Sequence, residues 1–176
     1  MKPGRSSKRE FAQGRSCSMR EYDGIEVRYR RPDADLAKSL QVIENLLGFA
    51  PEPQQVDFDL SFWAGGAGVL DKLAISCNVS LEQWQRLKQK LDLYSPEEMV
   101  ARDDCREDFI WLVADDEECG DILAASVQFI NDNKAPFQEA CDISQSIHFG
   151  YMSDVNTWTA VWGQGSRINY AYFCEG

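Results

Sequence analysis

The fold is decided by "QVDFDLSFW", residues 55–63, in which apolar and polar side chains alternate. Alternation with a period of two is typical of a β-strand that buries one face. The glycine-rich stretch "AGGAG" at 64–68 follows, and residues 70–78 then place Leu73, Ile75 and Cys77 on one face of a second strand. The sequence therefore predicts that residues 54–63 and 70–78 pair as antiparallel neighbours.

The segments on either side complete the first half of the chain. "GIEVRYRR" at 24–31 alternates like a strand, and a helix follows with apolar residues at 36, 40, 43 and 47. Gly48 stands where a helix C-terminus favours glycine. After the strand pair, "SLEQ" from Ser80 and "SPEE" from Ser95 are capping-box patterns, each predicting a helix start. The first half is predicted to run β-α-β-β-α.

The second half is predicted to begin with a strand at 109–113, buried on both faces, and a helix at 117–132. Three strand-like runs follow: "SIHFGYM" at 146–152, "TWTAVWG" at 157–163 and "RINYAYF" at 167–173. We therefore predict a single α+β domain over residues 22–176. Its antiparallel sheet has helices packed on one face and is built from two β-α-β-β-like halves. Residues 1–21 are predicted to be a disordered basic arm.

Charged residues are distributed unevenly along the chain. Residues 1–31 carry a net charge of +5, whereas the remainder carries −16. A folded body this acidic repels phosphate backbones, so the body is not expected to bind nucleic acid directly. The basic arm resembles a transit peptide in its Arg and Ser content but lacks an amphipathic apolar face. The alternative that we favour is a disordered extension preceding a start at Met19.

Neither a membrane span nor a secretory signal is expected. The longest apolar run, 109–114, is far shorter than the roughly 20 residues needed to cross a bilayer. The first twenty residues lack a signal-peptide pattern, so we expect a soluble cytoplasmic protein. The six cysteines form no short pair of the kind that builds zinc sites. Reduced and mostly buried thiols are the favoured interpretation, with disulfides as the alternative.

Three stretches of the sequence partly match known functional motifs, but each has a simpler explanation. "AGGAG" lacks the Lys-Ser/Thr of a phosphate-binding loop, so it is interpreted as a connection. An EF-hand beginning at Asp115 places Cys119 among the ligands and Ser126 where a glutamate belongs, so calcium binding is rejected. Asp57 and Asp59 resemble a catalytic carboxylate pair, but pairing with Arg28 and Arg30 of the neighbouring strand explains them better. No metal or cofactor is expected.

The stretch "LVADDEECGD" at 112–121 concentrates acidic side chains. One or two carboxylates in the first turn of the helix at 117–132 favour its dipole, but the stretch contains more. The surplus indicates either a solubility feature or the contact for a basic partner. The residues proposed to steer such a partner are Asp115, Asp116, Glu117, Glu118 and Asp121.

The C-terminal strands are rich in aromatic residues, which often contribute to protein interfaces together with charged ones. Trp158 and Trp162 share one face of their strand, and both faces of the last strand are apolar or aromatic. Burial in the core is the default expectation for these side chains. If exposed beside the acids, Trp158 and Trp162 are candidate interface anchors.

Two functional hypotheses follow. The leading one is a non-catalytic acidic binding protein, an inhibitor of the immunity or antitoxin type that neutralises a basic partner such as a bacterial toxin. The alternative is a small cytosolic hydrolase-type enzyme that uses the single histidine, His148, with carboxylates such as Asp57 or Asp154. That alternative needs these groups to meet in one cleft.

Overall fold

The two strands that decide the fold pair as their sequence predicts. A computed structural model describes residues 17–18, 27–30, 36–63, 69–116, 119–152 and 157–174. In it β3 (Val56–Trp63) and β4 (Val69–Asn78) are antiparallel neighbours, with Phe58 opposite Ile75 and Leu60 opposite Leu73. The apolar residues of both strands therefore share one face, which confirms the prediction.

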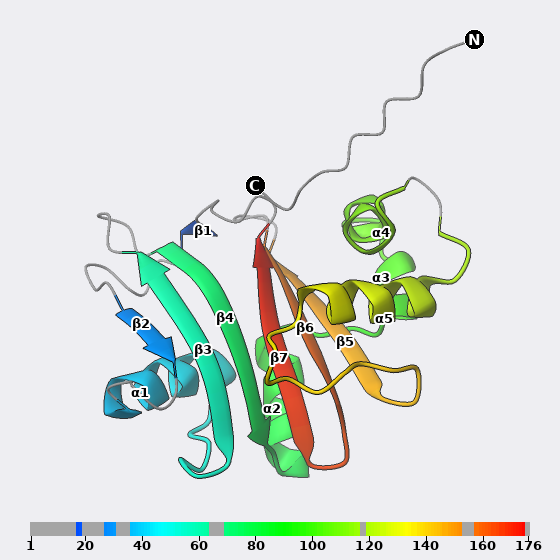
Figure 1. The fold of residues 1–176 in the computed structure, drawn as a ribbon. Helices are drawn as coiled ribbons and strands as arrows, with labels where there is room; N and C mark the ends of the chain where they lie inside the picture. Colours follow the sequence, from blue (N-terminus) through cyan, green and yellow to red (C-terminus); the bar gives the residue numbers. More distant parts are fainter. Residues whose placement is uncertain are drawn as a thin grey trace.

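All strands join one antiparallel sheet in the order β2-β3-β4-β7-β6-β5 (Figure 1). Each half of the sheet is a run of three consecutive strands, and the halves meet where β4 pairs with β7. A short additional strand, β1, pairs with β4 outside this path. The bounds of these strands are β1 Cys17–Ser18, β2 Val27–Arg30, β5 Ser146–Met152, β6 Thr157–Gln164 and β7 Arg167–Cys174.

The helices begin and end largely where local sequence signals place them. Ser80 and Ser95 each form a complete capping box, and Gly48 follows the first helix with a φ of 80°. These three features confirm the predicted ends. The helix bounds are α1 Leu36–Leu47, α2 Leu81–Lys90, α3 Pro96–Val100, α4 Arg106–Ala114 and α5 Ile122–Asn133.

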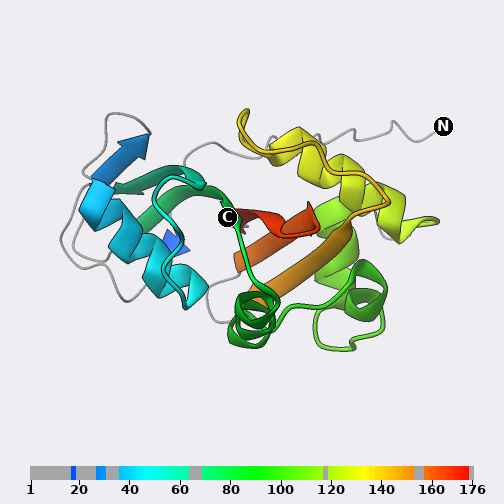
Figure 2. The same ribbon diagram turned by 90° about the horizontal axis from the view of Figure 1, so that it is seen from below.

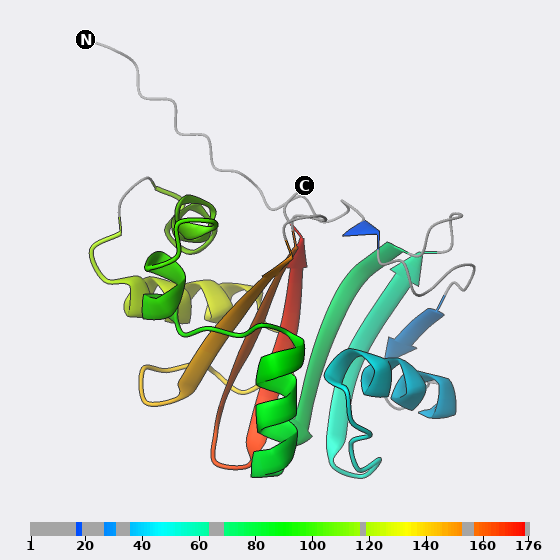
Figure 3. The same cartoon turned by 180° about the vertical axis from the view of Figure 1, so that it is seen from behind.

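Helices cover both faces of the sheet. Helices α1 and α2 lie against one face, as the view from behind shows (Figure 3), and α5 with the loop after it lies against the other (Figure 2). Two buried clusters result: one under α1 and α2 includes Leu47 and Leu87, and one under α4 and α5 includes Phe109 and Phe129. The sequence predicted α+β with an antiparallel sheet, which is confirmed, and α5 adds a layer on the second face.

One predicted strand is wrong. Residues 109–113 belong to helix α4, and they pack beside α3 and α5 instead of entering the sheet. The apolar run carries no periodicity that separates a buried strand from a buried helix. The second half therefore runs α-α-β-β-β after α3, so only the first half has the predicted β-α-β-β order. Of the predicted arm at 1–21, only Cys17 and Ser18 lie within the described residues.

Candidate functional site

The segment 92–121 holds nearly all of the net charge of the chain. It contains twelve Asp/Glu and two Arg, a net charge of −10 compared with −11 for the whole protein. It forms α3, α4 and the adjoining loops beside β5, at the end of the sheet away from α1 (Figure 1). We call this segment the acidic edge. Its described acids are all exposed: Asp92, Glu97, Glu98, Asp103, Asp104, Glu107, Asp108, Asp115, Asp116 and Asp121.

Some of these acids have local structural roles. The Asp121 side chain caps α5 by accepting a hydrogen bond of 3.0 Å from the backbone N–H of Ala124. Glu98 completes the capping box of α3. Arg102 pairs with Asp104 at 2.7 Å and lies 3.6 Å from Asp92. These roles involve four carboxylates, and Glu97, Glu107 and Asp108 lie in the first turns of α3 and α4, where the helix dipole favours a negative charge.

The dipole of helix α4 does not favour negative charges at Asp115 and Asp116. They follow α4 at its C-terminal end, where the helix dipole is negative and a carboxylate is unfavourable. Asp115 also adopts a left-handed backbone conformation with φ of 52°, which aspartate tolerates better than most residues. The helix dipole therefore gives no reason for these two charges.

The predicted steering residues divide into three groups. Asp115 and Asp116 are exposed, and they extend the surface of α4. Glu117 and Glu118 lie outside the described residues. The helix predicted from 117 begins at Ile122, so Asp121 is its N-cap and the preceding acids are not in its first turn. That part of the prediction is wrong, because Cys119, Gly120 and Asp121 all precede the first residue of the helix.

The predicted anchors Trp158 and Trp162 are both fully buried, so their proposed role at an exposed interface is wrong. Trp158 stacks on Tyr151 with ring centroids 4.2 Å apart and lies 5.6 Å from Phe109 of α4. Trp162 donates a hydrogen bond of 3.1 Å from its indole N–H to the carbonyl of Glu139. Helix α4 and the loop after α5 cover the aromatic face that the sequence left open.

The exposed tryptophan of this region is Trp111, which sequence reasoning missed. It has 42% of its surface exposed and lies on α4 within the acidic edge. The predicted strand at 109–113 placed it inside a sheet. The available signal was the pair of acids before the apolar run, Glu107 and Asp108, which favour the first turn of a helix.

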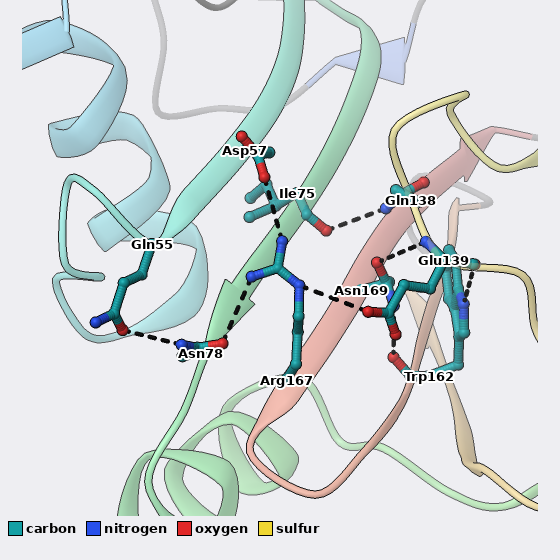
Figure 4. Close-up of polar contacts among 9 residues, drawn as sticks. All are labelled: Gln55, Asp57, Ile75, Asn78, Gln138, Glu139, Trp162, Arg167 and Asn169. Carbon is teal, nitrogen blue, oxygen red and sulfur yellow. Dashed lines mark hydrogen bonds and ion pairs between the residues drawn. The ribbon is translucent and has the colours of Figure 1, made fainter.

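A polar network joins the two halves of the sheet to the loop after α5 (Figure 4). Arg167 of β7 reaches across β4 to Asp57 of β3, at 3.2 Å, and approaches Glu139 in the loop after α5, at 3.8 Å. Its guanidinium also donates to Asn78 at 3.5 Å. Asp57 thus has a structural partner from the opposite half of the sheet. The register places the other predicted catalytic candidate, Asp59, opposite Arg30.

Gln138 anchors the same loop inside the protein. Its side-chain N–H groups donate to the carbonyls of Ile75 at 3.0 Å and Tyr170 at 2.8 Å, where β4 meets β7. Its side-chain oxygen accepts from the backbone N–H of Ala135 at 2.9 Å. Because buried hydrogen bonds of this kind are costly to break, the end of α5 is held firmly on the sheet. Helix α4 of the acidic edge packs on α5.

His148 lies on the opposite face of the sheet from Asp57. Asp57 pairs with Ser76, and pairing continues through Asn169 and Trp162 to Ile147. Paired residues share a face, so Ile147 is on the face of Asp57 and its neighbour His148 is not. The predicted cleft between His148 and Asp57 is therefore wrong, and Asp154 lies outside the described residues.

The surroundings of His148 favour its neutral form. Its ring contacts Trp84 edge-on at 5.2 Å, and its Nδ1 lies 3.3 Å from the Ser146 hydroxyl. Burial, helped by the charge of Lys88 and opposed by Glu98, lowers the pKa of His148 from 6.5 to about 4. A pocket of about 230 Å³ nearby contains Trp84 and Ser146 in its lining, but neither His148 nor any acid.

We predict that His148 contributes to the pH dependence of stability. Its pKa is depressed in the folded protein, so below pH 6.5 the unfolded chain binds a proton that the folded chain does not. Its contribution to stability is present above pH 6.5 and is lost as the pH falls toward 4. Denaturant unfolding measures the free energy of unfolding at about pH 7 and at about pH 5. This free energy should decrease less between the two pH values for His148→Gln than for the unaltered chain. Equal losses would contradict this account of His148.

No family model, curated protein or solved structure shows significant similarity to this chain. Within the described residues, no helix has both the length and the apolar character needed to cross a bilayer.

Proposed function

We propose that this protein is a non-catalytic binding module that neutralises a basic protein partner, as inhibitors of the immunity or antitoxin type do. The observation that carries the proposal is the concentration of charge: the described residues of the acidic edge hold ten Asp/Glu and two Arg, a net charge of −8, on one side of the sheet. Acids spread over a whole surface serve solubility, whereas charge gathered on one surface also directs an approaching cation.

Enzymes that act on nucleic acid must bind its phosphate groups. Such enzymes carry positive charge at their substrate site. An inhibitor that presents carboxylates there accelerates the encounter by long-range attraction and occupies the site that the substrate needs. A toxin that acts on nucleic acid is therefore the class of partner that this surface fits best.

The rigidity of the acidic edge supports the same function. Its inner side packs on the sheet through ring contacts of Phe109, whose centroid lies 4.9 Å from that of Phe149 and 5.6 Å from that of Trp158. A surface that is already ordered loses little conformational entropy when it binds. The carboxylates at the end of α4 are thus presented without a further ordering cost in the backbone.

Charge reversal tests this function. The variant Asp115→Lys/Asp116→Lys should lose a basic protein that the unaltered chain captures from the source organism at low ionic strength. The matched control, Glu44→Lys/Glu52→Lys, changes the net charge equally at two exposed positions toward the α1 end of the sheet. It should retain the partner, because its charges lie away from the acidic edge.

The capture experiment also tests whether the partner is held by charge. Raising the ionic strength should release a protein held by the acidic edge, since added salt screens exposed charges. Capture of the same protein by all three forms, with no effect of salt, would mean that the acids serve solubility alone. The proposed function would then be wrong.

A further inference from the structure

The outward face of α4 combines a large aromatic ring with acids. Trp111 is 42% exposed. Residues three and four apart are neighbours on a helix surface, so Asp108 and Glu107 flank Trp111 toward the N-terminus. Asp115 follows four residues later at the end of the helix. All three acids are exposed. We call Trp111 and these three acids the α4 outer face.

The packing of the residues that the structure describes does not use this face. The opposite side of α4 enters the core through Phe109, Leu112 and Val113, which are all buried. Tryptophan is a large side chain that is highly buried on average, and the core under α4 is already filled by Phe149 and Trp158. Packing among the described residues therefore does not account for a tryptophan at position 111, and tryptophan is enriched among the residues that dominate binding energy at interfaces.

The chain itself contains an example of what such a face binds. The guanidinium of Arg102 lies 4.3 Å from the centroid of the Tyr94 ring. The same guanidinium pairs with Asp104 at 2.7 Å and lies 3.6 Å from Asp92. One arginine thus contacts an aromatic face and two carboxylates at once, which combines a cation–π contact with ion pairs. The α4 outer face offers the same groups to an arginine from outside.

We propose that the α4 outer face is the docking surface for an arginine-bearing segment of the basic partner, with a guanidinium over the Trp111 ring and carboxylates at its edge. This inference rests on the proposed function and names the contact through which it acts. Charge complementarity selects the occupant, because a neutral or acidic segment gains nothing from the three carboxylates. Arginine fits better than lysine, since its planar guanidinium stacks on a ring while it pairs with a carboxylate.

An arginine-only peptide without tryptophan is a direct probe. The indole N–H signals of a ¹⁵N-labelled chain report on each of the five tryptophans, and the variant Trp111→Phe identifies the signal of Trp111. Titration should shift the Trp111 signal and leave those of the buried Trp158 and Trp162 in place. A lysine-only peptide of equal length should bind more weakly.

Substitution gives a second, independent measurement. Trp111→Ala should weaken peptide binding about tenfold or more, as truncating an interface anchor does. The matched control is Phe137→Ala, which removes an aromatic side chain of similar exposure, 39%, from the loop after α5. That variant should bind like the unaltered chain. Thermal unfolding of both variants verifies that they are folded.

The possible failures are distinguishable. Salt-sensitive binding of the peptide that is weakened by Asp115→Lys/Asp116→Lys but not by Trp111→Ala would overturn the docking surface and leave the proposed function standing. Loss of binding in Phe137→Ala alone would move the surface to the loop after α5. A Trp111 signal that never shifts would also overturn the inference. Salt-insensitive capture by all charge variants would overturn the function itself.

Discussion

Replacing Trp158 with alanine is expected to lower the free energy of unfolding by about 3–5 kcal/mol, the usual cost of emptying a buried tryptophan site. Trp158 is fully buried, stacks on Tyr151 at 4.2 Å and contacts Phe109 at 5.6 Å. Its loss opens a cavity where α4 packs on β5 and β6. Urea unfolding followed by circular dichroism measures the change.

Two variants serve as controls for this prediction. The indole N–H of Trp158 is buried with no hydrogen-bond partner among the described residues. Trp158→Phe removes that unpaired donor together with some volume, so it should cost much less than alanine, about 1 kcal/mol. Trp111→Ala, at a site 42% exposed, should also cost about 1 kcal/mol or less. A Trp158→Ala variant as stable as Trp111→Ala would contradict the core described for α4.

Gly163→Ala is expected to destabilise the protein by about 3 kcal/mol, because a side chain at this position meets backbone. A Cβ atom on Gly163 would lie 2.2 Å from the carbonyl oxygen of Arg167 and 3.0 Å from the Cα of Ile168. Strand β7 would have to move away from β6. The movement would also displace Arg167 from its contacts with Asp57 and Glu139.

Gly120→Ala is the matched control for Gly163→Ala. A Cβ on Gly120 meets no atom within 4 Å, so the change should alter the free energy of unfolding by no more than about 0.5 kcal/mol. Denaturant unfolding of the two variants side by side makes the comparison. Similar stability of Gly163→Ala and the unaltered chain would show that β6 and β7 are farther apart than the structure has them.

Much of the fold was predictable because its signals are local. Alternation identified β3 and β4, and capping boxes at Ser80 and Ser95 marked two helix starts within a few residues. The pairing of β4 with β7 was not predictable, because it joins segments about ninety residues apart through Arg167 and Gln138. No local pattern indicates which strands of two separate runs become neighbours.

The candidate site was predicted in part, and the error has a physical source. An unbroken apolar run fits a buried strand and a buried helix equally well, so 109–113 was assigned to the sheet. As a helix, the same run buries Phe109 and exposes Trp111. Trp158 and Trp162 are therefore buried beneath this helix and the loop after α5, and the exposed tryptophan ring that can take part in an interface there is that of Trp111. The acids Asp115 and Asp116 were identified from the sequence alone, because a cluster of acidic residues can be recognised without knowledge of the fold.

The most direct test of the acidic edge is the rate of association with the captured partner as a function of ionic strength. The rate for the unaltered chain should fall steeply with added salt, because the Debye length shrinks from about 30 Å at 0.01 M to about 3 Å at 1 M. Asp115→Lys/Asp116→Lys should associate at least about tenfold more slowly at low ionic strength, and its rate should approach that of the unaltered chain at high ionic strength. Glu44→Lys/Glu52→Lys should follow the unaltered chain much more closely. Rates that do not change with salt, or equal slowing by both charge reversals, would contradict the claim that the acidic edge recognises the partner.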